Sequence, residues 1–264
     1  MTPFIAIACI IVGTICLLIG VFAAYTRRFG AQLVKDAPTN ADPISVLIPA
    51  HNEEHCIAAC VGAVLNQRGV NLKEVIVILD RCTDGTAAAL VPLQADPRLR
   101  VMSLSACPSD WAGKVHALHY GSMQATGDWL VFIDCDVVVG PDLLRRARGS
   151  IGDNTLLSLI MDFRSSGIWD MLMIPLLGIA VNAHRPLRLV HDRRSKVAAA
   201  SGQFMMFPTH RYRALGGHAA VRGELLEDLA LAERVKHHGE GVMLAFTNGG
   251  AQVEMYSDWS SFHR

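Results

Sequence analysis

The chain has 264 residues, 51% of them hydrophobic, and its 24 basic side chains balance its 24 acidic ones. This length supports one domain with a large core, and the positive mean hydropathy of +0.30 indicates an additional membrane-associated part. Because the chain has neither a net positive charge nor a basic recognition stripe, its composition argues against a nucleic-acid partner.

The first apolar stretch, Phe4 to Tyr25, carries no charge and is followed at once by Arg27 and Arg28. As a helix it has about the ~30 Å needed to cross a bilayer. It is long for the core of a cleaved signal peptide, so residues 1–28 are predicted to be a retained transmembrane anchor. The arginines on its C-terminal side predict a single-pass protein of the cell (inner) membrane with the following domain in the cytoplasm. A wholly buried helix of a soluble domain is the alternative.

After a polar linker at 29–43, apolar strands are expected at Ile44–Ile48, Val75–Leu79, Leu99–Leu104 and Gly127–Val139, separated by helical patterns. Strands that alternate with helices predict an α/β domain over 44–264, with a mostly parallel sheet and helices on both faces. The seven cysteines are scattered without a CxxC pair, so the sequence predicts neither a zinc site nor a disulfide framework, and a reducing compartment is the simpler interpretation.

The stretch GDWLVFIDCDVVVG, residues 127–140, places two carboxylates, Asp134 and Asp136, at the exit of a buried strand. The carboxyl edge of a parallel sheet is where α/β folds bind ligands, and oxygen ligands there suit Mg²⁺ or Mn²⁺ carried by a phosphate. An ordinary loop with solvated acids explains the same pattern equally well. Neither the dinucleotide-binding glycine pattern nor a P-loop is present, so phosphates need another means of attachment.

A second apolar region lies between Ser165 and Val190 and is interrupted by Asp170 and Pro175. It is too short for a second membrane span. We expect an interfacial segment over 167–190, with Trp169 at the level of the lipid headgroups and arginines behind it. A core helix beneath the sheet is the alternative.

The order of motifs is more specific than any one of them. ISVLIPAHNEE, VIVILDRCTDGT, WAGKVHAL, FIDCDV and GELLEDLALAERVKHHG together resemble a family 2 inverting glycosyltransferase with the GT-A fold, from about Pro43 to Gly241. The tract between Ala198 and Gly239 further resembles membrane-anchored members that glycosylate lipids, such as the hopanoid-associated and carotenoid-associated enzymes. The resemblance implies a nucleotide-sugar half at 44–140 and an acceptor and base half at 141–264.

The resemblance also implies a role for each matching residue. The residues expected to contact the nucleotide sugar are Pro49, Ala50, Asn52, Glu53, Asp80, Lys114 and Asp134. Asp80 would read the uracil ring, and Lys114 would lie near the diphosphate. Asp136, with Asp134, would bind Mg²⁺ or Mn²⁺ and is the more direct ligand. Asp228, beside Glu227, matches the catalytic base, and Gly216, Gly217 and His218 are weaker candidates for the acceptor side. Without the resemblance, Glu227 and Asp228 are explained as acids at the positive end of a helix dipole.

These residue types also suit the chemistry directly. A divalent cation neutralises the charge that grows on a departing diphosphate, and a carboxylate on the opposite face can take the proton of an acceptor hydroxyl. Together with this chemistry, the resemblance implies metal-dependent inverting transfer from a UDP-sugar to a hydroxylated lipid. Two departures from the family pattern matter: Leu79 replaces an acid before Asp80, and no QxxRW motif follows the base, where Met255–Trp259 stand instead. The second departure favours transfer of a single sugar.

Two other functions are compatible with the sequence. The first is a tethered glycosyltransferase with a soluble acceptor. The second is a non-catalytic scaffold that binds a nucleotide sugar and joins a membrane-protein partner.

Overall fold

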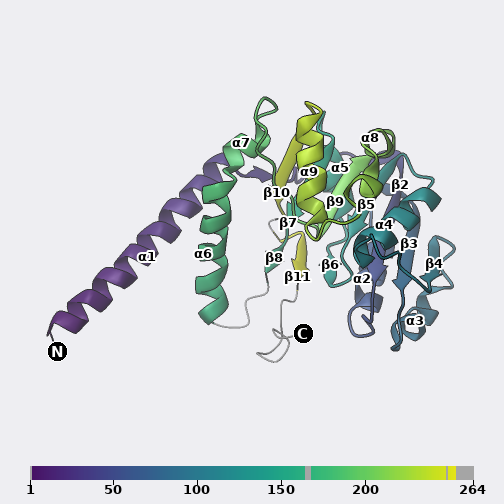
Figure 1. The fold of residues 1–264 in the computed structure, drawn as a ribbon, viewed down its shortest axis with the longest axis horizontal. Coiled ribbons are helices and arrows are strands. Elements are labelled where there is room, and N and C mark those ends of the chain that lie inside the picture. The colour runs from purple at the N-terminus through teal and green to yellow at the C-terminus, as the bar shows by residue number, and fades with distance from the viewer. Residues whose placement is uncertain (1, 164–167, 248, 254–264) are drawn as a thin grey trace.

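The computed structural model describes residues 2–163, 168–247 and 249–253 (Figure 1). The helices are α1 (Thr2–Phe29), α2 (Ile57–Leu65), α3 (Thr86–Ala89), α4 (Gly113–Gln124), α5 (Leu143–Ser150), α6 (Ile168–His184), α7 (Leu187–His191), α8 (Thr209–Ala214) and α9 (Glu227–His237), with 3₁₀ turns at Val91–Leu93 and Gly217–Val221. The strands are β1 (Ala31–Gln32), β2 (Asn40–Ala50), β3 (Val70–Asp80), β4 (Leu99–Leu104), β5 (Trp129–Ile133), β6 (Val137–Val139), β7 (Leu156–Ile160), β8 (Asp162–Phe163), β9 (Phe204–Pro208), β10 (Val242–Phe246) and β11 (Ala251–Val253).

The main sheet of the described chain has eight strands in the order β1-β10-β7-β9-β5-β2-β3-β4. All neighbouring pairs are parallel except those that β9 makes with β5 and β7. A smaller sheet has the order β6-β11-β8. The predicted α/β fold with a mostly parallel sheet is therefore confirmed.

Both faces of the main sheet are buried because its strands are apolar on both sides. In β2, Val46 and Ile48 belong to one core cluster with Val61 of α2, and Leu47 between them belongs to the other. The second cluster includes Leu118 of α4 and residues of α9. Successive side chains of a strand point to opposite faces, so an uninterrupted apolar run needs a layer of helices on each side.

Several boundaries differ from the sequence prediction: β1 lies within the predicted linker, and β3 begins at Val70, five residues before the predicted strand. β2 begins at Asn40, within the stretch predicted as a linker, because residues 40–50 pair along β3. The predicted strand at Gly127–Val139 is divided: β5 ends at Ile133, a turn closes with a hydrogen bond from Val137 N to the Asp134 carbonyl oxygen (3.2 Å), and β6 joins the smaller sheet. The turn holds Asp134, Cys135 and Asp136 where the two sheets diverge.

Helices α1 and α6 lie beside each other at one side of the sheet (Figure 1). Among the described residues, no helix combines the length and the apolar character needed to cross a bilayer, so the transmembrane helix predicted for residues 1–28 is not confirmed. Residue 167 of the predicted 167–190 segment lies outside the described residues, as does Met255–Trp259. The side chains of Leu177 and Val181 in α6 are 63% and 52% exposed, which excludes a fully buried core helix there.

Candidate active site

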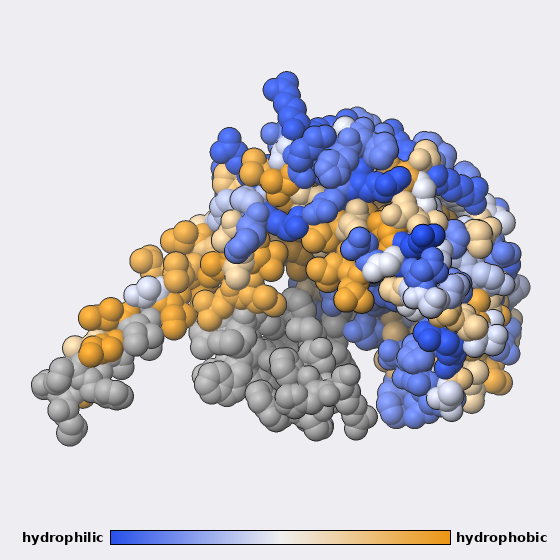
Figure 2. Space-filling view, in the orientation of Figure 1, coloured by the Kyte–Doolittle hydropathy of each residue, from blue (hydrophilic) through white to orange (hydrophobic). Residues whose placement is uncertain are grey.

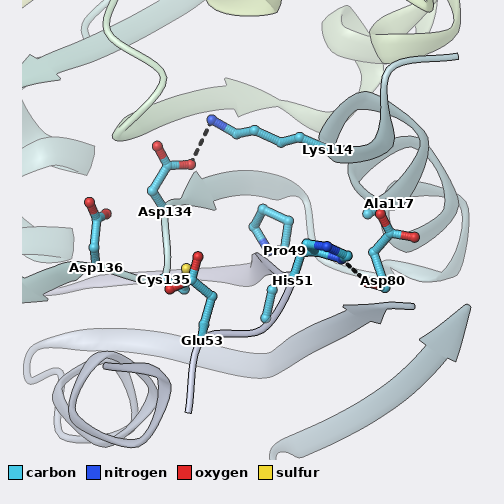
Figure 3. Close-up of a pocket in the computed structure, with 10 residues that line it drawn as sticks. Pro49, His51, Glu53, Asp80, Lys114, Ala117, Asp134, Cys135 and Asp136 are labelled. Carbon is cyan, nitrogen blue, oxygen red and sulfur yellow. Dashed lines mark hydrogen bonds and ion pairs between the residues drawn. The ribbon is translucent and has the colours of Figure 1, made fainter. Parts of the chain in front are cut away.

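The carboxyl ends of β2, β3 and β5 surround a cavity of about 250 Å³ (Figure 3). A cavity at this edge is expected, since crossover helices leave the carboxyl ends of parallel strands open. The residues that line it are Pro49, Ala50, His51, Glu53, Asp80, Lys114, Ala117, Asp134, Cys135 and Asp136. Six of the seven residues predicted to contact a nucleotide sugar are in this set, and so are both predicted metal ligands. The fold thus brings together residues from four separate βα units.

Lys114 links this cavity to the acidic pair Glu227 and Asp228. Its ammonium group lies 2.7 Å from Asp134 Oδ1 and 2.9 Å from Glu227 Oε1. Burial opposes the charged form of Lys114, but the two carboxylates outweigh burial and raise its pKa. The lysine comes from the first turn of α4 and Glu227 from the first turn of α9. Two motifs that are more than 100 residues apart in sequence therefore meet at one ammonium group.

The acids of the cavity are held in an environment that disfavours their charge. Burial raises the pKa of Asp134 to about 6, although the nearby Lys114 ammonium acts in the opposite direction. Burial likewise raises the pKa of Asp136, and the negative charge of Glu53 adds to that shift. Carboxylates gathered in this way are stabilised by a cation, and perturbed acids in a cleft are typical of functional sites.

Asp228 is half-buried in the first turn of α9. Its Oδ2 accepts a hydrogen bond from the Gly202 backbone N–H at 2.8 Å, and its Oδ1 accepts one from Leu229 N–H at 2.7 Å. Burial raises its pKa, and the neighbouring charge of Glu227 acts in the same direction. The two amides fix the orientation of the carboxylate, while the raised pKa makes it a better proton acceptor than an ordinary aspartate.

The end of β3 differs from the expectation of a freely available Asp80. Its carboxylate is paired with the adjacent Arg81, with distances of 2.9 Å from Nε to Oδ1 and 2.7 Å from Nη2 to Oδ2. Arg81 has a φ of 51°, a strained value for a residue with a side chain. Its backbone turn aims the guanidinium back at Asp80, so any ligand that reaches Asp80 also meets Arg81.

Asn52 does not line the cavity, unlike the other predicted donor residues. It has a φ of 59°, and its Oδ1 accepts a hydrogen bond from Thr83 N–H at 2.8 Å. This bond ties the loop after β2 to the loop after β3. The structure therefore gives Asn52 a part in shaping the cavity from outside.

Among the predicted acceptor-side residues, the structure places His218 in the core. Its ring is fully buried, its Nδ1 lies 2.6 Å from the Tyr212 hydroxyl, and burial lowers its pKa to about 3. Gly216 and Gly217, with φ of 83° and 51°, form the turn that leads into this core position. Left-handed backbone favours glycine, so this double glycine is explained by chain geometry.

The donor set of the cavity fits a hard divalent cation. Asp134 and Asp136 offer carboxylate oxygens from one turn, which is the ligand type that Mg²⁺ and Mn²⁺ prefer. The ammonium of Lys114 at Asp134 shows directly that this position attracts positive charge. A cation held by Asp134 and Asp136 would also stabilise their charged forms and so offset the effect of burial, which raises their pKa values.

A second, apolar hollow is lined in part by the chain segment that contacts Asp228. This groove, of about 560 Å³, is bounded by α1, α6 and the ends of β7 and β10. Its apolar lining includes Phe22, Ile160, Leu177, Val181, Leu244 and Phe246. Ser201 and Gln203 also line it, and Gly202 between them donates its N–H to Asp228. The groove therefore ends beside the half-buried carboxylate.

Comparison with known proteins identifies the family. The sequence profile described as "Glycosyl transferase family 2" matches residues 45–207, which is more than half of the chain. The chain belongs to glycosyl transferase family 2. This family consists of glycosyltransferases (EC 2.4), so the family and enzyme class predicted from the motifs are confirmed.

The similar curated proteins are longer than this family 2 chain. The succinoglycan biosynthesis protein ExoO of Rhizobium meliloti is 31% identical over 103 residues, which cover 39% of this chain and 28% of that protein. A poly-β-1,6-N-acetyl-D-glucosamine synthase of Staphylococcus aureus is 27% identical over 125 residues, which cover 46% of this chain and 29% of that protein. The matched segments thus span less than a third of either relative.

Solved structures confirm the GT-A fold. The mannosyltransferase PcManGT from Pyrobaculum calidifontis, in complex with GDP-Man and Mn²⁺, has a TM-score of 0.60 at 16% identity, over 96% of this chain and 69% of that one. Glucosyl-3-phosphoglycerate synthase from Mycobacterium tuberculosis, in complex with Mn²⁺, UDP and its product, has a TM-score of 0.54 at 21% identity, over 84% of this chain and 75% of that one.

Sequence reasoning missed several groups of this site. His51 lines the cavity, and its Nδ1 lies 2.5 Å from the Asp80 carbonyl oxygen; its position directly after β2 is a signal that could have identified it. Arg81 follows a strand end in the same way. Gly202 acts through its backbone N–H, and no side-chain pattern marks such a residue.

Proposed function

We propose that this protein is a metal-dependent, inverting glycosyltransferase that moves one sugar from a UDP-sugar to a hydroxylated lipid at the cytoplasmic face of the cell membrane. The observation that carries the proposal is that the residues around Asp228 connect it to two hollows of different chemistry. Its neighbour Glu227 contacts Lys114, which lines the polar cavity, and Gly202, which donates its N–H to Asp228, lies between Ser201 and Gln203 of the apolar groove.

The polar cavity suits the donor. Asp134 and Asp136 would hold Mg²⁺ or Mn²⁺, which when bound would neutralise the diphosphate. Lys114 adds a fixed positive charge beside Asp134. The nucleobase would lie toward Asp80 and His51, where the Asp80 carboxylate can accept the imide N–H of uracil through lone pairs that Arg81 does not use.

Asp228 suits the role of general base. Its carboxylate is fixed by the N–H groups of Gly202 and Leu229, which leaves lone pairs on both oxygens to accept the acceptor's hydroxyl proton. Removing that proton strengthens the nucleophile that attacks the sugar carbon as the diphosphate departs from the opposite face. A single displacement of this kind inverts the configuration of the sugar carbon.

The apolar groove favours a lipid with a neutral hydroxyl as the acceptor. Its lining from α1, α6, β7 and β10 is dominated by apolar side chains, so it can bury hydrocarbon. Among its lining residues, the one cation is Arg185, which already contacts Glu233 Oε1 at 3.0 Å and the Ala198 carbonyl oxygen at 2.8 Å. An acceptor hydroxyl therefore suits the groove better than an acceptor phosphate does.

The exposed surface of the protein supports placement against a membrane. Figure 2 shows apolar residues gathered along α1. Within this helix, Ile10 and Leu17 are 67% and 66% exposed. Leu225 and Leu226, immediately before Glu227, are 88% and 65% exposed. Exposed arginines follow the apolar part of α1 and lie near α7: Arg27, Arg28, Arg188, Arg193 and Arg194. Apolar side chains flanked by arginines are typical of surfaces that contact anionic lipid.

The proposal is tested by supplying labelled nucleotide sugars with Mn²⁺ to the full chain, together with either extracted lipids or polar acceptors. Label should pass to the lipid fraction, and Asp228→Asn should prevent it. Replacing Leu177 and Val181 by aspartate should lower lipid transfer without changing donor binding, whereas Val91→Asp, which is equally exposed at 61% but distant, should not. Transfer to polar acceptors alone would overturn the lipid assignment. Equal, near-zero turnover in the wild type and Asp228→Asn would favour a scaffold.

A further inference from the structure

Three potential metal ligands converge beside the donor cavity, from two loops. Glu53 and Cys56 lie between β2 and α2, and Cys135 lies in the turn between β5 and β6. The ligand atoms of all three side chains lie within 4.8 Å of one another. Figure 3 shows the Glu53 carboxylate adjacent to the Cys135 sulfur. No sequence motif marks this cluster, because 78 residues lie between the two cysteines.

The spacing of the cluster matches a tetrahedral site. Cys56 Sγ lies 3.2 Å from Glu53 Oε2. Bonds of about 2.3 Å to sulfur and about 2.0 Å to oxygen at tetrahedral angles place neighbouring ligand atoms roughly 3.5–3.8 Å apart. The three side chains therefore need only small rotations to bind one ion. All three are half-buried, which leaves a fourth position open to water or to another side chain.

The chemistry of these ligands differs from that of Asp134 and Asp136. Two thiolates and one carboxylate select a borderline-soft ion, whereas carboxylates alone select Mg²⁺ or Mn²⁺. We propose that Glu53, Cys56 and Cys135 form a Zn²⁺ site next to the donor cavity and distinct from the Asp134 and Asp136 pair. Nothing in this assignment depends on which sugar or acceptor the protein uses.

The position of this zinc site has a consequence for the donor cavity. Glu53 and Cys135 both line the cavity, and Cys135 stands between Asp134 and Asp136 in sequence. Zinc bound by these residues would restrict the turn that carries the two aspartates. It would also hold the Glu53 carboxylate, which would then no longer be available to a ligand in the cavity. Zn²⁺ should therefore reduce the affinity for a nucleotide sugar, acting as an inhibitor rather than as the ion that assists transfer.

The test is a titration of the reduced, full-length protein with Zn²⁺ against a chromophoric chelator, in excess Mg²⁺ to occupy carboxylate-only sites. We expect one Zn²⁺ per chain, and Co²⁺ in its place should give the sulfur-to-cobalt absorption of a thiolate site. Cys56→Ser and Cys135→Ser should each weaken Zn²⁺ binding at least tenfold and diminish that absorption. Cys107→Ser, outside the cluster, should change neither.

Glu53→Gln provides a second variant, which keeps both thiols and should also weaken binding. Circular dichroism and thermal unfolding would verify that each variant is folded. Zn²⁺ affinity unchanged in Cys56→Ser and Cys135→Ser would overturn the proposal. Loss of Zn²⁺ binding in Asp136→Ala, but in none of the three cluster variants, would overturn it as well, because the ion would then belong to the aspartate pair.

Discussion

Two groups of carboxylates on the same sheet have opposite electrostatic environments. Toward the amino ends of β2, β3 and β5, the buried Glu74 accepts hydrogen bonds at 2.8 Å from the Ser45 hydroxyl and from the N–H and hydroxyl of Thr126, and it contacts Arg100 at 2.5 Å. Burial acts to raise its pKa, but these bonds outweigh burial and lower the pKa to about 2. At the carboxyl end of β5, burial raises the pKa values of Asp134 and Asp136, and it does the same for Asp228 in the first turn of α9.

This difference shows how the chain divides stability from function. The Glu74 carboxylate accepts hydrogen bonds from several donors, so its negative charge stabilises the pairing of three neighbouring strands. The aspartates of the candidate site are only partly buried but have fewer compensating groups, so their charges destabilise the fold until a ligand compensates them. Functional residues commonly carry such a cost. Substitutions at the two edges should therefore have different effects on activity and opposite effects on the free energy of unfolding.

The largest effect is expected for Asp228→Asn. Removing a general base lowers the turnover number by about 10²–10⁴-fold, while the amide keeps the shape of the side chain. Single-turnover transfer from a labelled donor measures the loss, and donor affinity should stay within about twofold of wild type. A variant that retains full turnover would show that another group takes the proton.

Asp136→Ala should act on donor binding instead. Losing a direct metal ligand should weaken the metal-dependent binding of a nucleotide sugar by about 100-fold or more, because even outer partners of a metal site cost about 10–100-fold. Calorimetric titration with and without Mn²⁺ would measure this change. Glu74→Gln serves as the control, since its side chain lies at the opposite edge. Unchanged affinity in Asp136→Ala would remove Asp136 from the metal site.

Glu74→Gln should act on stability alone. The folded pKa lies below the ordinary value of 4.5, so Glu74 stabilises the fold above pH 4.5 and loses this contribution as the pH falls toward 2. A shift of this size corresponds to about 3 kcal/mol. Denaturant unfolding should show a destabilised variant at pH 7 and a difference that shrinks below pH 4.5. A pH-independent difference would contradict the hydrogen-bond account.

Asp134→Asn should change the pH dependence of stability in the opposite direction. The folded pKa of Asp134, about 6, lies above its ordinary value of 3.8, so the metal-free wild type loses stability as the pH rises from about 4 through 6. The variant cannot titrate there, so its free energy of unfolding should rise relative to wild type by about 2 kcal/mol, a value reduced for the partial exposure of this side chain. Denaturant unfolding at pH 4, 5, 6 and 7 measures how the free energy of unfolding of the variant, relative to wild type, changes with pH. A difference that falls as the pH rises would contradict the raised pKa of Asp134.

The sequence was sufficient for much of the fold because its strands are continuous apolar runs. Leu99–Leu104 is β4 as predicted, and the carboxyl ends of β2, β3 and β5 converge as parallel strands must. The division of β5 from β6 was missed because Val137–Val139 is as apolar as the strand before it. The hydrophobic pattern of the sequence indicates which residues are buried, but it does not show in which of the two sheets they pair.

The candidate site was predictable where side chains follow strand ends and where motifs match the family. The ion pair of Lys114 with Glu227 was not predictable, because it joins helices α4 and α9, which begin more than 100 residues apart. The burial of His218 was also missed, since a histidine beside glycines resembles an exposed turn. The cluster of Glu53, Cys56 and Cys135 depends on the same kind of long-range contact.

The most direct test of the account is thermal unfolding of the full chain with a panel of nucleotide sugars, each with and without Mn²⁺. A ligand that binds only the folded state raises the unfolding temperature, and the rise grows with the logarithm of the ligand concentration relative to Kd. The account predicts that a UDP-sugar raises this temperature only when Mn²⁺ is present, and that Asp136→Ala abolishes the rise while Asp228→Asn preserves it. A rise that is the same without metal, or no rise with any nucleotide sugar, would contradict it.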